Sequence, residues 1–271
     1  MDSYDEKKSL TAGQKDTESL LPPLSSNPFS TNGLQEIDNY INDIFNGKTD
    51  FVRFNTPEHA GLCRAGKVLI GAEIIASYAR RSIGSGGHAG ESQTGSSDNW
   101  QIDAVQEEWV ERWARATEVW FDDADEQIEA AYGPQIAAGA EAIVYYRSGE
   151  TSVVKERTSI YSTLQKAFDA IALHNHLFPE SSMQVIGFTR SKDGLFRTIL
   201  TQPYIRCERL ATKREISDYV ASKGLHPDEG SFTESYINER IVLEDMHPAN
   251  VFINAESHQP LCIDCIVKFK P

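Results

Sequence analysis

The fold-deciding stretch of this chain is Leu243-Glu244-Asp245-Met246-His247-Pro248-Ala249-Asn250. Two short apolar runs follow it, and the second leads into Ile263-Asp264-Cys265. Together these segments place an aspartate, an asparagine five residues later and a second aspartate fourteen residues beyond that. Phosphoryl transfer requires one carboxylate that orients the attacking hydroxyl, and an amide oxygen and a second carboxylate that hold Mg2+ against the phosphates. We therefore expect Asp245 to be a catalytic residue, and Asn250 and Asp264 to be metal ligands.

The segments around this motif predict a loop followed by a hairpin. Apolar residues at 241–243 predict a strand that enters the loop, and those at 251–253 predict a strand that leaves it. A third apolar run, 261–263, follows a polar turn, so it predicts the hairpin partner that returns Asp264 beside Asp245. A plain surface hairpin with incidental carboxylates remains an alternative, because Asp and Asn are common in turns.

Length and charge limit the classes of protein to which this chain can belong. Its 271 residues suffice for one or two domains with a sizeable core. The formal net charge of -14 argues against a nucleic-acid interface, which needs clustered Lys and Arg. The chain has no run of eighteen apolar residues and its first residues are charged, so we expect no membrane span and no signal peptide. The location expected from these features is cytoplasmic.

Four cysteines are present: Cys63, Cys207, Cys262 and Cys265. They do not suggest a disulfide scaffold. The last two form a CxxC pair around Asp264, but a zinc site would need two further ligands at similar spacing, and the sequence shows none. His174 and His176 are too close in sequence to share one face of a helix, so we expect no metal-binding pair there. Small buried thiols in a reducing compartment are the expectation.

Changes in composition divide the chain into five segments: 1–33, 34–81, 82–101, 102–206 and 207–271. The first is rich in Ser, Pro, Lys and Asp and is expected to be disordered. The second has apolar residues at helical spacing over 34–45 and 57–81, which predicts an α-helical N-terminal region. The third is rich in Gly and Ser, which is typical of a flexible linker. The fourth opens with predicted helices at 102–117 and 126–132.

A second motif begins at residue 135. The pattern of 135–146 predicts a strand, a tight turn and a strand, and the turn consists of the small residues Ala138, Gly139 and Ala140. Residues 151–155 return as an alternating strand that carries Lys155. Small residues let a backbone approach phosphates closely, and a lysine on the returning strand can neutralise them. These residues are therefore candidates for binding a nucleotide.

The elements predicted after Lys155 are a helix at 159–178, strands at 183–189 and 195–201, a helix at 212–224 and a helical turn at 231–238. The helix at 212–224 has a clear start signal. Thr212 is followed three residues later by Glu215, which is the spacing of a capping box.

From about Val105 onward, the chain resembles the kinase-like domain found in polyvalent proteins of phages and mobile elements. The resemblance covers about three-fifths of the chain, and the order of its motifs is more specific than any one of them. The residues that carry it are EWVERWA (108–114), AAGAEAIVYY (137–146), VVKER (153–157), IALHNHLFPES (171–181), IGF (186–188), TQPYI (201–205), LEDMHPANVFI (243–253) and CIDCI (262–266).

The resemblance implies an α+β, protein-kinase-like bilobal fold that uses ATP and Mg2+ as cofactors. Lys155 would bind the phosphates as a further catalytic residue. The connector that contains Gln202 and Tyr204 would hydrogen-bond the adenine edge. In kinases the helix after the lysine strand carries a glutamate that pairs with the lysine. Asp169 is the nearest acid on this helix, so it is a candidate for the partner, and a solvated surface aspartate is the alternative.

Two departures limit what the resemblance implies. Protein kinases have His-Arg-Asp where this chain has Leu243-Glu244-Asp245. The chain therefore lacks the arginine that binds a phosphorylated activation loop. The chain ends at Pro271, seven residues after Asp264, so we expect a much reduced C-lobe without an activation segment or a peptide platform.

Three functions therefore stay open. The first is an active minimal kinase that phosphorylates a protein or a small-molecule hydroxyl with ATP and Mg2+. The second is a pseudokinase or nucleotide-binding module that interacts with a partner. The third is an AMP transferase that uses the same metal ligands with an inverted nucleotide.

Overall fold

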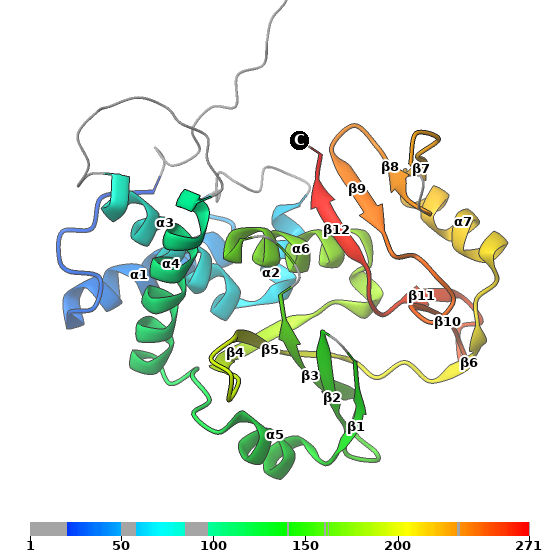
Figure 1. Ribbon diagram of the computed structural model, residues 1–271, viewed down its shortest axis with the longest axis horizontal. Helices are drawn as coiled ribbons and strands as arrows, with labels where there is room; N and C mark the ends of the chain where they lie inside the picture. The colour runs from blue at the N-terminus through cyan, green and yellow to red at the C-terminus, as the bar shows by residue number, and fades with distance from the viewer. Residues whose placement is uncertain are drawn as a thin grey trace, which may run out of the picture.

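A computed structural model describes residues 21–49, 58–84, 97–139, 141–159, 161, 163–231 and 234–270. It is a mixed structure of α-helices and antiparallel sheets, which confirms the α+β class (Figure 1). None of the helices in these ranges is long and apolar enough to cross a membrane.

The central element is a five-stranded antiparallel sheet in the order β1-β2-β3-β5-β4. Its strands are β1 (Gln135–Ala138), β2 (Ala142–Tyr145), β3 (Ser152–Thr158), β4 (Gln184–Arg190) and β5 (Phe196–Pro203). Helix α5 (Ala124–Tyr132) packs on one face, where Ile128 joins Tyr145, Val154 and Ile199 in a small buried cluster. Because side chains alternate along a strand, Lys155 and Arg157 of β3 point to the opposite face.

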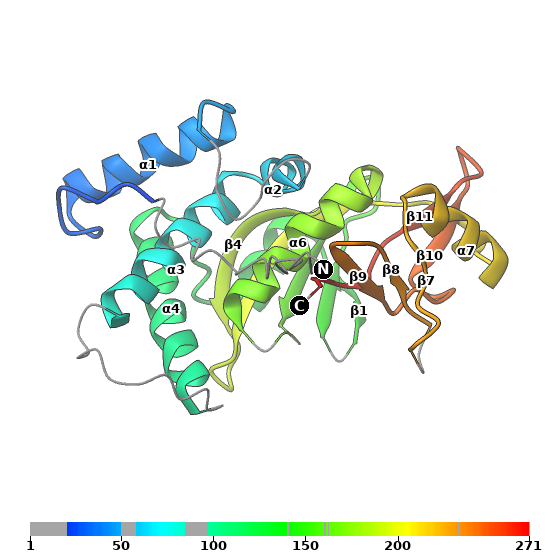
Figure 2. The same ribbon diagram turned by 90° about the horizontal axis from the view of Figure 1, so that it is seen from above.

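Helix α6 (Leu164–Leu177) connects the sheet to the rest of the molecule. It starts where Thr163 Oγ1 accepts a hydrogen bond from the Lys166 amide, at 3.2 Å, which satisfies a free N–H of the first turn. Two of its faces are buried in different cores. Phe168 and Ile171 pack with strands β4 and β5 and the N-terminal helices, whereas Leu173 and Leu177 pack with the C-terminal strands. Figure 2 shows α6 between these two parts of the molecule.

The C-terminal part contains two small antiparallel sheets, ordered β11-β10-β6 and β12-β9-β8-β7. Their strands are β6 (Cys207–Leu210), β7 (His226–Pro227), β8 (Tyr236–Ile237), β9 (Ile241–Glu244), β10 (Val251–Asn254), β11 (Pro260–Cys262) and β12 (Ile266–Phe269). The predicted loop and hairpin are confirmed: β9 enters the loop, and β10 pairs with β11. After Asp264, β12 pairs with β9 and so brings the second aspartate back beside the first.

Two short elements complete this part of the chain. Helix α7 (Lys213–Ser222) has the predicted capping box, in which Thr212 and Glu215 bond to each other's backbone amides. A 3-10 turn, η2 (Pro179–Ser181), follows α6. The helical turn predicted at 231–238 is wrong, because Tyr236–Ile237 forms strand β8 between β7 and β9. The pairing of these residues with two strands outweighs their local propensity.

Four helices precede the sheet: α1 (Thr31–Phe45), α2 (His59–Ala65), α3 (Lys67–Gly84) and α4 (Ser97–Ala116). The single helix predicted at 57–81 is divided at Gly66, whose φ of 90° no helix allows. Structure also begins earlier than expected. Leu21, Leu24 and Phe29 pack against the main core, although 1–33 was expected to be disordered. Residues 1–20 and most of the predicted linker, 85–96, lie outside the described residues.

The N-terminal helices dock on α6 through a close backbone contact. A Cβ added at Gly61 of α2 would lie 2.0 Å from the carbonyl oxygen of Ala172 in α6. Gly61→Ala is therefore expected to lower the free energy of unfolding by about 1–3 kcal/mol, because the two helices must move apart. Chemical denaturation measures this change. Gly139→Ala is the matched control, since its added Cβ would meet only Ala142 O, at 3.8 Å. Equal stability of the two variants would contradict the docking.

Candidate active site

A cleft of about 490 Å3 lies between the central sheet and the C-terminal strands. Its walls come from the β1–β2 turn, strand β3, the connector after β5, the Asp245 loop and the segment around Asp264. The predicted site residues that line it are Gly139, Lys155, Gln202, Tyr204, Asp245, Asn250 and Asp264. The fold therefore brings both motifs into one cavity.

The Asp245 loop is held by a pair of hydrogen bonds within the motif. Asp245 has a φ of 64°, a left-handed conformation that costs a non-glycine residue energy and is found at functional loops. Asn250 Nδ2 donates to the Asp245 carboxylate at 2.8 Å and to its carbonyl at 3.0 Å. Because this amide nitrogen faces the acid, the amide oxygen of Asn250 is left for a cation.

His247 gives the Asp245 carboxylate a second contact. The amide of Ala249 donates to His247 Nδ1 at 3.2 Å, and His247 Nε2 lies 3.2 Å from Asn250 Nδ2. Nε2 lies 3.4 Å from Asp245 Oδ1. Asp245 is thus oriented by neighbours on both sides, while its side chain stays about half exposed to the cleft, at 46%.

Asp264 is the most strongly paired acid of the cleft. Its Oδ1 lies 3.2 Å from Arg157 Nη2 and accepts a hydrogen bond from the Cys265 amide at 3.0 Å. Burial favours the neutral acid, but the charges of Arg157 and Lys155 outweigh it and hold the pKa of Asp264 below its usual value. The residue is therefore an anion at neutral pH, as a metal ligand must be.

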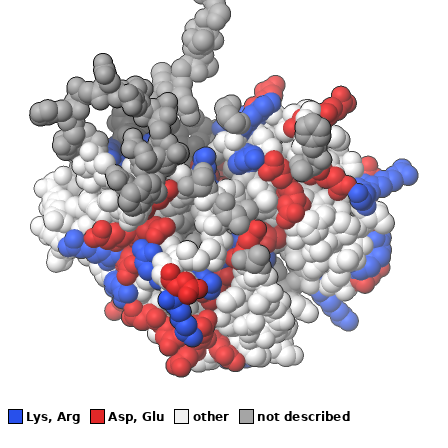
Figure 3. Space-filling view, viewed as in Figure 1, with Lys and Arg blue, Asp and Glu red and all other residues white. Residues whose placement is uncertain are grey.

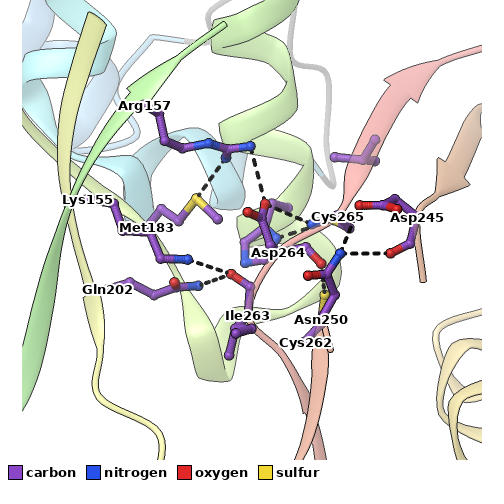
Figure 4. Close-up of polar contacts among 12 residues, drawn as sticks. Lys155, Arg157, Met183, Gln202, Asp245, Asn250, Cys262, Ile263, Asp264 and Cys265 are labelled. Carbon is purple, nitrogen blue, oxygen red and sulfur yellow. Dashed lines mark hydrogen bonds and ion pairs between the residues drawn. The ribbon is translucent and has the colours of Figure 1, made fainter. Parts of the chain in front are cut away.

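Lys155 lies at the back of the cleft and is buried. Its Nζ donates to the carbonyl oxygen of Ile263 at 2.9 Å, and Gln202 Nε2 donates to the same oxygen at 3.1 Å (Figure 4). Burial lowers the pKa of Lys155 more than the nearby Asp264 carboxylate raises it. The acid beside Lys155 is thus Asp264. Asp169, the partner expected from kinases, lines a separate cavity with Arg80, so that expectation is wrong.

The connector and the small-residue turn form the outer walls of the cleft. Tyr204 stacks on Tyr146, with ring centroids 4.4 Å apart, and its amide donates to the carbonyl of Thr151. The amide of Ile205, which also lines the cleft, has no backbone partner among the residues that the structure describes. The side chain of Gln202 is buried and forms part of the back wall of the cleft.

The β1–β2 turn contributes fewer residues than the sequence predicted. Gly139 lines the cleft, and its amide donates to the carbonyl of Ala142 at 2.8 Å. Ala138 is not among the lining residues, and Ala140 lies outside the described residues. A Cβ at Gly139 would meet only one atom within 4 Å, so space for a ligand remains in front of this turn.

The sequence did not single out three residues that lie beside Asp245 or Asp264: Glu141, Arg157 and His247. Arg157 could have been found, because it lies two residues after Lys155 on a strand and therefore on the same face. Glu141 gave no signal, since its position depends on the turn. Burial raises the pKa of Glu141, and the charges of Asp264 and Asp245 add to this effect while Arg157 opposes it. Glu141 thus lies close enough to Asp264 and Asp245 to feel their charges.

Acidic side chains are also widespread outside the cleft. On the face shown in Figure 3 they lie between scattered basic side chains, and the described residues form no continuous basic patch there. This distribution agrees with the formal net charge of -14. The absence of a nucleic-acid partner stays a prediction.

The sequence of this chain matches a known protein family. The profile of a family described as "Serine/Threonine/Tyrosine Kinase found in polyvalent proteins" matches residues 103–271. The chain belongs to this family. The match begins within α4 and includes every residue of the cleft, so the expected resemblance to the polyvalent-protein kinases is confirmed. A search of curated proteins found no significant match. Membership assigns the chain, at a coarse level, to kinase-like phosphotransferases.

The pairing of Arg157 with Asp264 predicts a pH dependence for this member of the polyvalent-protein kinases. The folded-state pKa of Asp264 is depressed, so its ionised form stabilises the fold at neutral pH, and the contribution is lost as the pH falls through that pKa. Arg157→Met removes the largest opposing charge. We expect the loss to begin at higher pH and stability at neutral pH to fall by about 1–2 kcal/mol.

Urea denaturation at a series of pH values between neutral and about pH 3 measures this shift. Arg214→Met is the matched control, because Arg214 is 91% exposed and lies 3.9 Å from Asp218. Identical pH profiles for Arg157→Met and the wild type would show that Asp264 does not depend on Arg157.

Proposed function

We propose that this chain is an ATP- and Mg2+-dependent phosphotransferase with a bilobal kinase-like architecture and a reduced C-lobe. The observation that carries the proposal is the convergence of Asp245, Asn250, Asp264 and Lys155 on one cleft. The volume of about 490 Å3 falls within the range of roughly 300–1,000 Å3 typical of small-molecule sites. The acceptor is a hydroxyl of a protein or a small molecule.

The residues of the cleft suit a metal–nucleotide complex. Apolar side chains such as Val153 and Ile205 lie beside the connector, where they would sandwich a base, and the Ile205 amide offers it a hydrogen-bond donor. Lys155 offers a cation for the phosphates once its Nζ turns from the Ile263 carbonyl. The Asp264 carboxylate and the Asn250 amide oxygen are hard oxygen donors of the kind that Mg2+ binds.

Each protein group has a separate task in the proposed reaction. Bound Mg2+ would neutralise the charge that develops on the transferring phosphate. Asp245 orients the acceptor hydroxyl and takes its proton, and its carboxylate is held for this purpose by Asn250 and His247. Lys155 balances charge on the phosphates from the opposite wall.

Partners and location remain proposals of the same kind. We infer a nucleotide and a hydroxyl acceptor as partners, with neither nucleic acid nor membrane, in the cytoplasm. The family is described from polyvalent proteins, and we infer from the resemblance a role in a mobile element.

Labelled ATP separates the proposed activity from its alternatives. With ATP labelled at the γ-phosphate, we expect Mg2+-dependent transfer of label to the protein or to an added acceptor, and no transfer from ATP labelled at the α-phosphate. Transfer of the α-label would show an AMP transferase. A thermal shift with ATP and Mg2+ but no transfer of either label to a broad panel of acceptors would favour a nucleotide-binding module.

A further inference from the structure

A buried group of soft ligands lies directly behind Asp264. His174 of α6 meets Cys262 and Cys265, and the three potential ligand atoms all lie within 4.8 Å of one another. All three side chains are buried, and both cysteines are free thiols. The CxxC spacing alone predicts no zinc site here, because the third ligand comes from a helix about ninety residues away in the chain. Figure 4 shows the two cysteines beside Asp264.

The spacing of these atoms suits a tetrahedral zinc ion. Zn–S bonds of about 2.3 Å and Zn–N bonds of about 2.0–2.1 Å at tetrahedral angles separate sulfur from nitrogen by roughly 3.6 Å, and two sulfurs by roughly 3.8 Å. His174 Nδ1 lies 3.5 Å from Cys265 Sγ. Two further donor atoms lie beside Cys262 Sγ, the carbonyl oxygen of Asp264 at 3.1 Å and the sulfur of Met246 at 3.8 Å.

The hydrogen bonds around His174 are those of a metal ligand. Its Nε2 lies 3.2 Å from the carbonyl oxygen of Ser181. A carbonyl can only accept, so Nε2 carries the proton, and the lone pair of Nδ1 points at the cysteines. Metal-binding histidines usually donate their other N–H to a backbone carbonyl or carboxylate, which fixes both the tautomer and the ring orientation.

We propose that His174, Cys262 and Cys265 bind a zinc ion, which ties α6 to the segment that carries Asp264. On binding, two Zn–S bonds and one Zn–N bond form, and the two thiol protons leave to water. No electrons are transferred. Two thiolates and a neutral imidazole make the zinc complex neutral, which suits a buried position. Cu+ with the same ligands would leave a net negative charge beside the Asp264 carboxylate. Cys265 also lines the cleft, which gives the ion a way in.

The test measures metal binding by the full chain without nucleotide, so its result is independent of the proposed phosphotransfer. Protein purified under reducing conditions and stripped with a chelator is titrated with Zn2+, and separately with Co2+ as a spectroscopic probe. We expect about one equivalent of bound Zn2+ per chain and thiolate-to-cobalt charge-transfer absorption. If Asp264→Asn retains this absorption, the zinc site does not depend on the Asp264 carboxylate, which is a proposed Mg2+ ligand.

Matched variants assign the ligands. Cys265→Ala and His174→Ala are expected to lose at least ten-fold in Zn2+ affinity, while the double variant Cys63→Ser/Cys207→Ser keeps the affinity of the wild type. If an alanine variant does not fold, the cobalt spectrum of the wild type still decides the question. Absence of both bound Zn2+ and thiolate-to-cobalt absorption in the reduced wild type would overturn the proposal. Unchanged Zn2+ affinity in both alanine variants would overturn it as well.

Discussion

Asp264→Ala is expected to weaken Mg2+-dependent nucleotide binding by about 100-fold or more, because the variant lacks the anionic ligand that would join the metal to the protein. Titration of the protein with a fluorescent ATP analogue, with and without Mg2+, measures this effect. In the wild type, Mg2+ should raise the affinity for the nucleotide. In the variant, the affinities with and without Mg2+ should be nearly equal.

Two controls separate loss of the ligand from loss of the fold. Asp264→Ala leaves Arg157 and Lys155 without their shared anion, so some destabilisation is expected, and thermal melting must show that the variant is folded. Asp193→Ala, in an exposed turn, should behave as the wild type in both assays. Unchanged Mg2+-dependent affinity in folded Asp264→Ala would remove Asp264 as a metal ligand.

Asp245→Asn is expected to lower the rate constant of phosphoryl transfer by about 10²–10⁴-fold, the usual contribution of a positioned general base. Affinity for ATP and Mg2+ should change little, because the proposed metal ligands are Asn250 and Asp264. Single-turnover transfer of γ-label at saturating ATP measures the rate constant, and the fluorescent analogue measures the affinity.

Asp245→Asn is expected to change the charge of the side chain and to leave the loop conformation unchanged. Asparagine keeps the size of Asp245 and tolerates the left-handed φ of 64° better than most residues, so the loop should retain its shape. His247→Gln serves as the comparison, since it removes the imidazole beside the carboxylate but leaves the carboxylate itself. Transfer by Asp245→Asn at the wild-type rate would show that Asp245 is not the base.

Much of this site could be predicted from the sequence because its chemistry is local in the chain. Asp245 and Asn250 lie on one loop, and the polar turn between two apolar runs was enough to predict the hairpin that returns Asp264. The strands and the small-residue turn at 135–146, and the strand that carries Lys155, could be predicted in the same way. In each case a period of two and a turn signal coincide, so local propensity and tertiary structure agree.

Several of the errors concern contacts between distant elements. The rotation of α6 about its axis decides whether Asp169 or His174 faces the segment around Asp264, and helical periodicity shows only which residues share a face. Gly66 ends a helix because of its backbone conformation, although the apolar pattern continues through it. Tyr236 and Ile237 form a strand because β7 and β9 provide partners on both sides.

The most direct test of the proposed function is a crystal structure of the protein with a non-hydrolysable ATP analogue and Mn2+ in place of Mg2+. We expect the adenine beside Ile205, the phosphates at Lys155, the metal between Asn250 and Asp264, and the γ-phosphate nearest to Asp245. A nucleotide in the opposite orientation, with its α-phosphate at Asp245, would contradict the proposed phosphotransfer. A nucleotide bound outside the cleft, or a metal bound without Asp264, would contradict the assignment of the site.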